Sequence, residues 1–479
     1  MKPSTAAIPF VLFWFSILLH SIADQAFDVR QHLSTVTRYG AVKDVGNSSS
    51  LQFSIHEGCT PIHLNLVARH GTRSPTKKRM RELNLLASHL EELIRDAKEQ
   101  KLSLQKVPTW LQGWKSPWRG KLKGGELISK GEDELYDLGI RIRKRFPDLF
   151  KEEYHPDVYP IKATQVPRAS ASAVAFGMGL FSEKGSLGPG HHQLLQSAVK
   201  AVQAFRKSQE PAVYKLKEPI LDEITATLVS RYELNFTRQT LLLYGFSEAS
   251  LLDITDQACG LFSPSEVALL EWTDDLEMFI LKGYGKSINY RMGVPLLKDV
   301  VHSMEQALRH KKVIHVIKGF YERQDYGLHM QRRWFLSHVY LVFSLNDQNL
   351  KIQREQPLEL PPRPPHSRNW WGSMVAPFAG NNLLVLHSCP ANPSSKYFIQ
   401  VLHNERPITM PGCNNSDFCP FEEFKEMIVA PHLKHDYNTI CTKKLEQPEQ
   451  KFETSKLLLL FHWLFSLGRD ETESTKADL

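Results

Sequence analysis

Residues 64–75 read Leu-Asn-Leu-Val-Ala-Arg-His-Gly-Thr-Arg-Ser-Pro, and this stretch decides the fold that we expect. Its first half is a short apolar run typical of a mostly buried strand. Gly71 then permits a tight turn, and Pro75 fixes the backbone just beyond it. Apolar residues recur at helical spacing between Met80 and Ala97, which predicts a helix. The unit is therefore strand, turn and helix, and its turn lies at a strand's carboxyl end, where open α/β sheets bind ligands.

The turn places two arginines around one histidine, namely Arg69, His70 and Arg73. Two guanidinium groups in one tight turn repel each other unless an anion lies between them, and arginine binds phosphate bidentately. The N-terminus of the following helix adds backbone N–H donors. A histidine held there can attack the bound phosphorus as a nucleophile. An isolated Arg-His-Gly is more often a surface histidine in a basic loop, but the full pattern after a buried strand favours phosphate chemistry.

The pattern Arg-His-Gly-x-Arg-x-Pro resembles the histidine acid phosphatase family, and its continuation through Lys77 and Lys78 resembles the multiple inositol polyphosphate phosphatase, or phytase-type, branch. The resemblance implies an enzyme that hydrolyses phosphomonoesters of inositol polyphosphates such as phytate. It implies that His70 becomes phosphorylated and that Arg69 and Arg73 hold the phosphate. Lys77 and Lys78 would face the other phosphates of the substrate. The resemblance implies no cofactor and no metal ion.

Two later segments also resemble the family. Residues 125–127, Gly-Glu-Leu, precede an amphipathic helix that we expect to reach Phe146. Arg168 follows an expected strand over residues 158–163 and precedes a helix rich in small residues. In the family an arginine in this context is the third phosphate ligand, so we expect Arg168 to join the site. Taken alone, such a residue is more often a capping or surface arginine.

The family's proton donor is missing from the chain. An acid must protonate the leaving alkoxide, a contribution of about 10²–10⁴ in rate. The family supplies it from His-Asp or His-Ala-Glu at the end of a later strand, which should fall near residues 322–345. Neither motif occurs there, and in the chain as written His329 and His338 are the nearby candidates.

One hypothesis is that residues 323–345 are read out of frame. Reading the codons one base earlier permits an apolar strand that ends in His-Ala-Glu, because Met330-Gln331 forces alanine and Trp334-Phe335 forces valine. A frameshift or a gene-model error would produce this sequence. If the chain is genuine as written, the alternative function is a catalytically impaired lumenal protein that binds inositol polyphosphates.

The composition fits a globular protein of one large or two moderate domains, with 479 residues, 42% hydrophobic and 23% charged. We predict a three-layer α/β core, discontinuous over residues 50–196 and 293–445, in which residues 383–386 and 397–402 form paired strands. A helical insertion over residues 197–292 would cover the active-site face. The net charge of +7 suits an anionic substrate, and there is no basic run with interleaved aromatics to indicate nucleic acid.

Both ends of the chain carry targeting features. Residues 1–23 are typical of a secretory signal, with an apolar run at 6–19 followed by small residues. A membrane anchor is the alternative, and we expect no stable span in the mature chain. Residues 26–46 are expected to form a mobile arm, and residues 446–479 a terminal helix with a charged tail. The last four residues resemble a retention signal for the endoplasmic reticulum lumen, the other expected fates being secretion or the vacuole; they are Lys476-Ala477-Asp478-Leu479.

The six cysteines of a secreted chain predict disulfides. Resemblance to phytase-type members implies three pairs, which are Cys59 with Cys389, Cys413 with Cys419, and Cys259 with Cys441. Neither Cys-x-x-Cys nor His-Glu-x-x-His occurs, so the sequence predicts no metal site. Glycosylation sequons agree with secretion, and they lie at Asn47, Asn235 and Asn414.

Overall fold

The computed structural model describes residues 27–42, 56–121, 123–163, 166–181, 197–244, 248–282, 294–310, 317–320, 364 and 371–433. These residues fall within one compact unit, Met1–Tyr437. The expected signal segment, C-terminal helix and retention signal lie outside the described residues. So do residues 322–345, Asn47 and Cys441.

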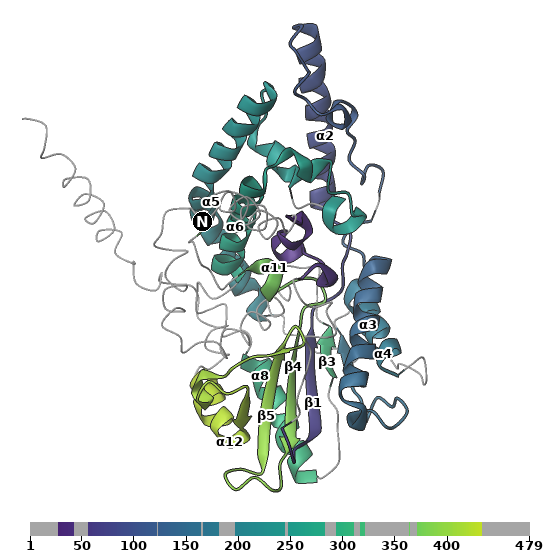
Figure 1. Cartoon of the computed structure of the whole chain (residues 1–479), viewed down its shortest axis with the longest axis vertical. Coiled ribbons are helices and arrows are strands. Elements are labelled where there is room, and N and C mark those ends of the chain that lie inside the picture. The colour runs from purple at the N-terminus through teal and green to yellow at the C-terminus, as the bar shows by residue number, and fades with distance from the viewer. Residues whose placement is uncertain are drawn as a thin grey trace, which may run out of the picture. The chain divides into compact units, whose positions relative to one another are not determined.

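A mixed β-sheet forms the centre of the fold (Figure 1), with the strand order β2-β3-β1-β4-β5-β6 and with β7 paired to β5. The strand bounds are β1 Thr60–Ala68, β2 Ile161–Ala163, β3 Ile317–Phe320, β4 Asn381–Ser388, β5 Tyr397–His403, β6 Arg406–Pro407 and β7 Phe418–Pro420. β1, β2 and β3 run parallel, whereas β4 is antiparallel to β1 and β5 is antiparallel to β4. β4 and β5 are the predicted paired strands.

Helices cover both faces of this sheet. On one face, α3 (Ser129–Arg145) and α4 (Pro167–Phe181) share an apolar cluster with β1, β4 and β5. On the other face, α8 (Val294–His310) shares a second cluster with the same strands, together with the short helix α12 (Phe421–Glu423). The expected three-layer α/β arrangement is therefore confirmed.

The turn that carries the histidine begins at the carboxyl end of β1, a central strand of the sheet. β1 is buried because Leu64 and Leu66 contact one helical layer while Val67 contacts the other. Ala68, the last residue of β1, pairs with Phe320 at the end of β3 and with Asn381 at the start of β4. The carboxyl ends of the parallel strands β1 and β3 therefore lie side by side where the turn begins, as the sequence predicted.

Residues 197–282 are helical wherever the structure describes them as regular. The helices are α5 (Ser197–Tyr232), a 3-10 helix at Arg238–Leu243, a π-helical turn at Glu248–Leu252, a 3-10 helix at Ala258–Leu261 and α6 (Pro264–Lys282). They share an apolar cluster with α2 (Lys77–Glu99), and this cluster is separate from the two that flank the sheet. Figure 1 shows α5 and α6 beyond the end of the sheet at which β1 stops, together with α11 (Gly372–Val375).

The expectation of a mobile arm is wrong for residues 27–42. Three 3-10 helices form there, at Val29–Gln31, Ser34–Val36 and Tyr39–Ala41, and Leu33, Thr37 and Tyr39 are buried. Backbone carbonyls hold this segment: Ser250 Oγ donates to the Val36 carbonyl at 2.7 Å, and the Phe378 N–H donates to the Thr37 carbonyl at 2.9 Å. Elements this short show no apolar period, so the sequence pattern missed them. We call residues 32–37 the strap.

Two of the three expected disulfides occur among the described residues. Cys59–Cys389 joins the start of β1 to the end of β4, and Cys413–Cys419 closes a short loop before β7. Cys259 is buried, and its expected partner lies outside the described residues. The sequon residues Asn235 and Asn414 are both exposed.

Among the described residues, none of the helices is both long enough and apolar enough to cross a bilayer.

Candidate active site

His70 lies directly beyond the carboxyl end of β1 and is 1% exposed. Its Nδ1 is 2.6 Å from the carbonyl oxygen of Gly71. A carbonyl oxygen only accepts hydrogen bonds, so Nδ1 carries the proton in the neutral ring and Nε2 carries the lone pair. The ring also lies 5.6 Å from that of Phe378, centroid to centroid. The imidazole is thereby fixed in the tautomer and orientation that a nucleophile through Nε2 requires.

The backbone of the turn is held by α3 and α4. A Cβ on Gly71 would lie 1.9 Å from the carbonyl oxygen of Gly131, so only glycine fits at this position. The backbone N–H of Gly71 donates to Ser172 Oγ at 3.1 Å. The N–H and the hydroxyl of Thr72 both donate to the carboxylate of Glu134, each at 2.8 Å. Burial raises the pKa of Glu134, although the bonds from Thr72 favour its ionised form.

Arg69 is 2% exposed and its guanidinium is clamped on three sides. Nη1 donates to the carbonyl oxygen of Thr35 at 2.5 Å and to that of Ala376 at 2.8 Å. Cζ lies 4.2 Å from the centroid of the Phe378 ring, which is a cation–π contact. The strap and the segment before β4 therefore set the position of this arginine.

Residues 124–127 connect Arg168 to the turn that carries Arg73. Residues 124–127 lie along the turn, since the N–H of Gly125 donates to the Pro75 carbonyl at 2.7 Å and Arg73 forms a bridge with Leu127. Arg168, 5% exposed in the first turn of α4, donates from Nη1 to the Gly125 carbonyl at 2.8 Å. Gly125 has a φ of +78°, which glycine adopts readily. The predicted third arginine is thus attached to the segment that lies against Arg73.

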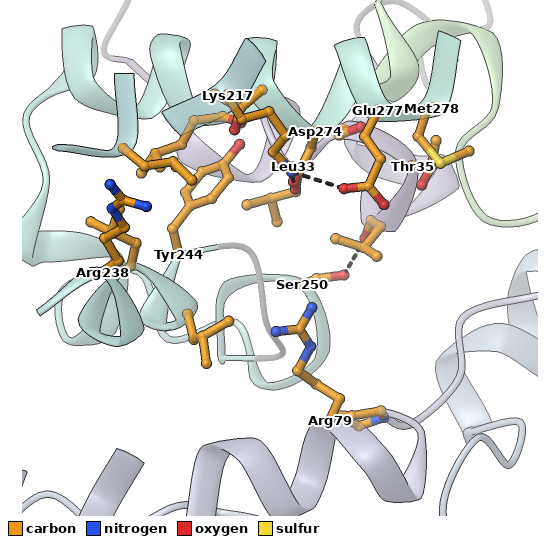
Figure 2. Close-up of a pocket in the computed structure, with 18 of the residues that line it drawn as sticks. Leu33, Thr35, Arg79, Lys217, Arg238, Tyr244, Ser250, Asp274, Glu277 and Met278 are labelled. Carbon is orange, nitrogen blue, oxygen red and sulfur yellow. Dashed lines mark hydrogen bonds and ion pairs between the residues drawn. The ribbon is translucent and has the colours of Figure 1, made fainter. Parts of the chain in front are cut away.

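A pocket of about 500 Å³ opens beside the turn (Figure 2). Arg73, Pro75 and Phe378 belong to its lining, and the rest comes from the strap, α2, α5, α6 and the segments between α5 and α6. The helical segment thus contributes one wall of a pocket that Arg73 and Pro75 of the turn also line, whereas His70, Arg69 and Arg168 are not among its lining residues.

Three cations of this lining were not predicted from the sequence, namely Arg79, Lys217 and Arg238. Arg79 follows Lys77 and Lys78 on the first turns of α2, and Figure 2 shows it extending from that helix into the pocket. Lys77 and Lys78 are exposed, and neither is among the described residues that line the pocket. Thr76 caps α2, so Lys77 is the first helical residue. Once the start of the helix is known, helical spacing distinguishes the directions in which Lys77, Lys78 and Arg79 point.

Carboxylates neutralise the cations on the far wall. Lys217 Nζ lies 2.8 Å from Glu277 Oε2 and 3.7 Å from Asp274 Oδ1, and all three residues line the pocket. Burial would lower the pKa of Lys217, but Glu277 and Asp274 outweigh it and the pKa is raised. Arg238 pairs with Glu218 at 2.8 Å. The far wall is therefore an ion-pair network whose cations stay charged across the neutral and acidic range.

His403 is the last residue of β5, and Glu405 follows it by two positions. His403 Nδ1 lies 2.8 Å from Asn382 Oδ1, and burial lowers the His403 pKa to about 3. Glu405 pairs with Arg141 at 2.8 Å and accepts from the Tyr39 hydroxyl at 2.9 Å. Both side chains are therefore engaged in holding the sheet edge.

A buried histidine at a strand end, with arginines on the same turn and helices over both sheet faces, is the arrangement of a histidine phosphatase. The chain belongs to the histidine phosphatase superfamily (branch 2), whose sequence model matches residues 62–404. The resemblance found in the motifs, to multiple inositol polyphosphate phosphatases and phytases, is confirmed at the level of distant homology.

Relatives of known name share about a quarter of their residues with this chain. Multiple inositol polyphosphate phosphatase 1 of Homo sapiens is 24% identical over 392 residues, covering 74% of this chain and 76% of that protein. A thiamine-repressible acid phosphatase of Schizosaccharomyces pombe is 24% identical over 423 residues, covering 81% and 83%.

Solved structures share the fold. The phytase from D. castellii has a TM-score of 0.61 at 14% identity, covering 95% of this chain and 96% of that one. The multiple inositol polyphosphate phosphatase of Bifidobacterium longum, crystallised with inositol hexasulfate, has a TM-score of 0.58 at 15% identity, covering 84% and 98%. The fold is thus that of histidine acid phosphatases and phytases, and the two disulfides are typical of the secretory pathway.

Proposed function

We propose that this protein hydrolyses phosphomonoesters of inositol polyphosphates, phytate among them, through a phosphohistidine at His70. The observation that carries the proposal is the hydrogen bond from Nδ1 of His70 to the Gly71 carbonyl, because it leaves the lone pair on Nε2 at the ligand-binding edge of the sheet. Nε2 attacks phosphorus, and the bond between phosphorus and the inositol oxygen breaks. Water then attacks the phosphohistidine, which releases inorganic phosphate and restores the imidazole.

Three arginines support phosphoryl transfer in this proposal. Arg69, Arg73 and Arg168 would bind the non-bridging oxygens and stabilise the charge that develops on them in the transition state. Backbone carbonyls accept hydrogen bonds from Arg69 and Arg168, so both guanidiniums are oriented before substrate arrives. Preorganised donors of this kind avoid the cost of reorientation during the reaction.

The leaving inositol oxygen needs a proton, and we propose that the acid comes from the chain that follows β3. Phe320, the last residue of β3, pairs with Ala68, which directly precedes the catalytic turn. A proton donor shortly after Phe320 would therefore follow a strand end that lies next to the start of the turn. Residues 322–345 lack the family's His-Ala-Glu, so the reading frame of that segment decides whether the donor is present.

The basic residues of the pocket support a substrate with several phosphates. Arg79 and Arg73 line one pocket, and Lys217 and Arg238 line it as members of ion pairs with carboxylates. A relative of this chain is named for inositol polyphosphates. Lys77 and Lys78, exposed at the start of the same helix as Arg79, would contact phosphates that project out of the pocket. We place the reaction in the lumen of the secretory pathway, with retention through residues 476–479 or onward transport as the two routes.

The second candidate is a protein that binds inositol polyphosphates without hydrolysing them. It is favoured by the missing proton-donor motif, because the phosphate-binding arginines are present while the acid is not. In this candidate, the arginines and the pocket still bind the inositol polyphosphate, and His70 is not phosphorylated.

Phosphate release from phytate by the purified full-length chain tests the proposal, together with detection of phosphohistidine by mass spectrometry. We expect release and a phosphorylated His70 in the wild type, and neither in His70→Ala, which should stay folded. Binding of phytate by calorimetry without release would favour the second candidate. Release by His70→Ala at the wild-type rate would remove the nucleophile assignment.

A further inference from the structure

Two carboxylates that the proposed reaction does not use lie buried on α6. Glu271 is 0% exposed and Asp275 is 1% exposed, and they lie one helical turn apart on the same face. A buried carboxylate is costly unless hydrogen bonds compensate its lost hydration. The partners of these two residues therefore show what the structure uses them for.

Both carboxylates join the same two segments, the strap and α11. Asp275 Oδ1 accepts from Ser34 Oγ at 2.6 Å and from the backbone N–H of Gly372 at 3.0 Å. Glu271 Oε2 lies 2.9 Å from His32 Nδ1, and Glu271 Oε1 accepts from Ser373 Oγ at 2.8 Å. Each carboxylate thus takes one bond from the strap and one from α11. We call this pair the α6 clamp.

The segments that the clamp joins are those that hold Arg69. Thr35, whose carbonyl accepts from Arg69, is the neighbour of Ser34 in the strap. Ala376, whose carbonyl accepts the second bond, directly follows α11, and that helix contains Gly372 and Ser373, which bond to the clamp. Phe378, which lies against the guanidinium, is tied to the strap by its bond to Thr37. Thr35 thus lies within the strap, whereas Ala376 and Phe378 follow α11 closely in the chain.

The junction is tightly packed. A Cβ added to Gly372 would lie 2.4 Å from Asp275 Oδ1 and 2.6 Å from Ser34 Oγ. The neighbouring face of α6 carries Asp274 and Glu277, which line the pocket together with Thr35 of the strap (Figure 2). One helix thus contacts the pocket with one face and fixes the strap with the next.

We propose that Glu271 and Asp275 are positioning residues, which hold Arg69 in its phosphate-binding geometry through the strap and α11. This inference rests on the proposed role of Arg69 as a phosphate ligand. Stability alone would be served as well by an apolar pair, since replacing buried charges with well-packed hydrophobic residues is often neutral or stabilising. Directional bonds to the two segments that orient one guanidinium are what carboxylates add.

The test is binding of inorganic phosphate by the full-length protein, measured by calorimetry beside the melting temperature. The variants are Asp275→Ala and Glu271→Ala, with Ser34→Ala as a milder change should either fail to fold. Glu266→Ala is the matched control, because Glu266 is a buried carboxylate of α6 that accepts from Arg231 at 2.6 Å and does not contact the strap. All four variants should lose melting temperature.

We expect phosphate affinity to fall about tenfold in the clamp variants, because small displacements of a binding group are enough for such losses, and to stay at the wild-type level in Glu266→Ala. In an Arg69→Gln background, Asp275→Ala should cause no further loss, since the clamp acts through that arginine. Unchanged affinity in a folded clamp variant, or an equal loss in Glu266→Ala, would overturn the inference. A wild-type protein that binds no phosphate would overturn the proposed function and this inference with it.

Discussion

The carboxylate of Glu134 accepts both the backbone N–H and the hydroxyl of Thr72, two residues beyond the proposed nucleophile. The first turns of α3 are thereby bonded directly to the turn that carries His70. Glu134 also accepts from the N–H of Tyr39 at 3.2 Å, so the same side chain reaches the segment that follows the strap.

Replacing Glu134 by alanine should therefore destabilise the protein and lower its activity. Two donors of Thr72 would lose their acceptor, at a cost of about 1–3 kcal/mol each when they remain buried. The free energy of unfolding in urea and the rate of phosphate release measure the two effects. Asp137→Ala, an exposed acid on the same helix, is the control and should change neither. Equal stability of the two variants would contradict the role given to Glu134.

Gly71→Ala should abolish activity, because the new Cβ would meet the Gly131 carbonyl at 1.9 Å and the turn would have to move away from α3. Gly113→Ala provides the comparison, since a Cβ there meets nothing within 4 Å. Phosphate release and circular dichroism of both variants check the prediction. An active, fully folded Gly71→Ala protein would show that the turn tolerates displacement.

Arg79→Ala should lower the hydrolysis of phytate more than it lowers the hydrolysis of a simple phosphomonoester. Arg79 lines the pocket beyond Arg73, so its loss should lower kcat/KM for phytate about tenfold while leaving p-nitrophenyl phosphate almost unchanged. The ratio of the two kcat/KM values is the measurement, with Arg81→Ala, exposed on the same helix, as the control. A larger effect of Lys77→Ala or Lys78→Ala would assign the role to the exposed lysines instead.

His387 makes the fold sensitive to acid. Burial, reinforced by His56, lowers its pKa to about 4 from an ordinary value of 6.5, so the folded state keeps it neutral where the unfolded chain would bind a proton. The stability that this provides is complete above pH 6.5 and is lost as the pH falls toward 4, by about 3 kcal/mol in all.

His387→Phe should therefore flatten the dependence of the melting temperature on pH between 6.5 and 4. Part of the slope should remain, because burial also lowers the pKa of His403, to about 3. His155→Gln, at an exposed position, should leave the slope as it is in the wild type. A slope that is the same in His387→Phe and the wild type would refute this origin of acid sensitivity.

Local patterns predicted the centre of this fold well. The strand, turn and helix around His70 follow from periodicity within about thirty residues, and the paired strands β4 and β5 follow from two short apolar runs. The pairing of Cys59 with Cys389 and of Cys413 with Cys419 was implied by the family resemblance and is confirmed. These features depend on neighbours in sequence or on strong motifs.

Polar contacts between distant segments could not be predicted in the same way. Ser34 and Asp275 are separated by 241 positions, and neither belongs to a pattern that would mark it. Arg79 was missed because two lysines before it looked more like the family's basic residues, whereas the start of α2 decides which side chain faces the pocket. The direction of a side chain on a helix depends on where the cap lies, and the cap at Thr76 is a property of the folded turn.

The strap gives the N-terminal segment a consequence for proteolysis. Because the Thr35 carbonyl is one of the groups that orient Arg69, a protease that removed residues 27–42 would release that guanidinium while sparing every described strand of the sheet. We expect limited digestion near the amino terminus to weaken phosphate binding irreversibly.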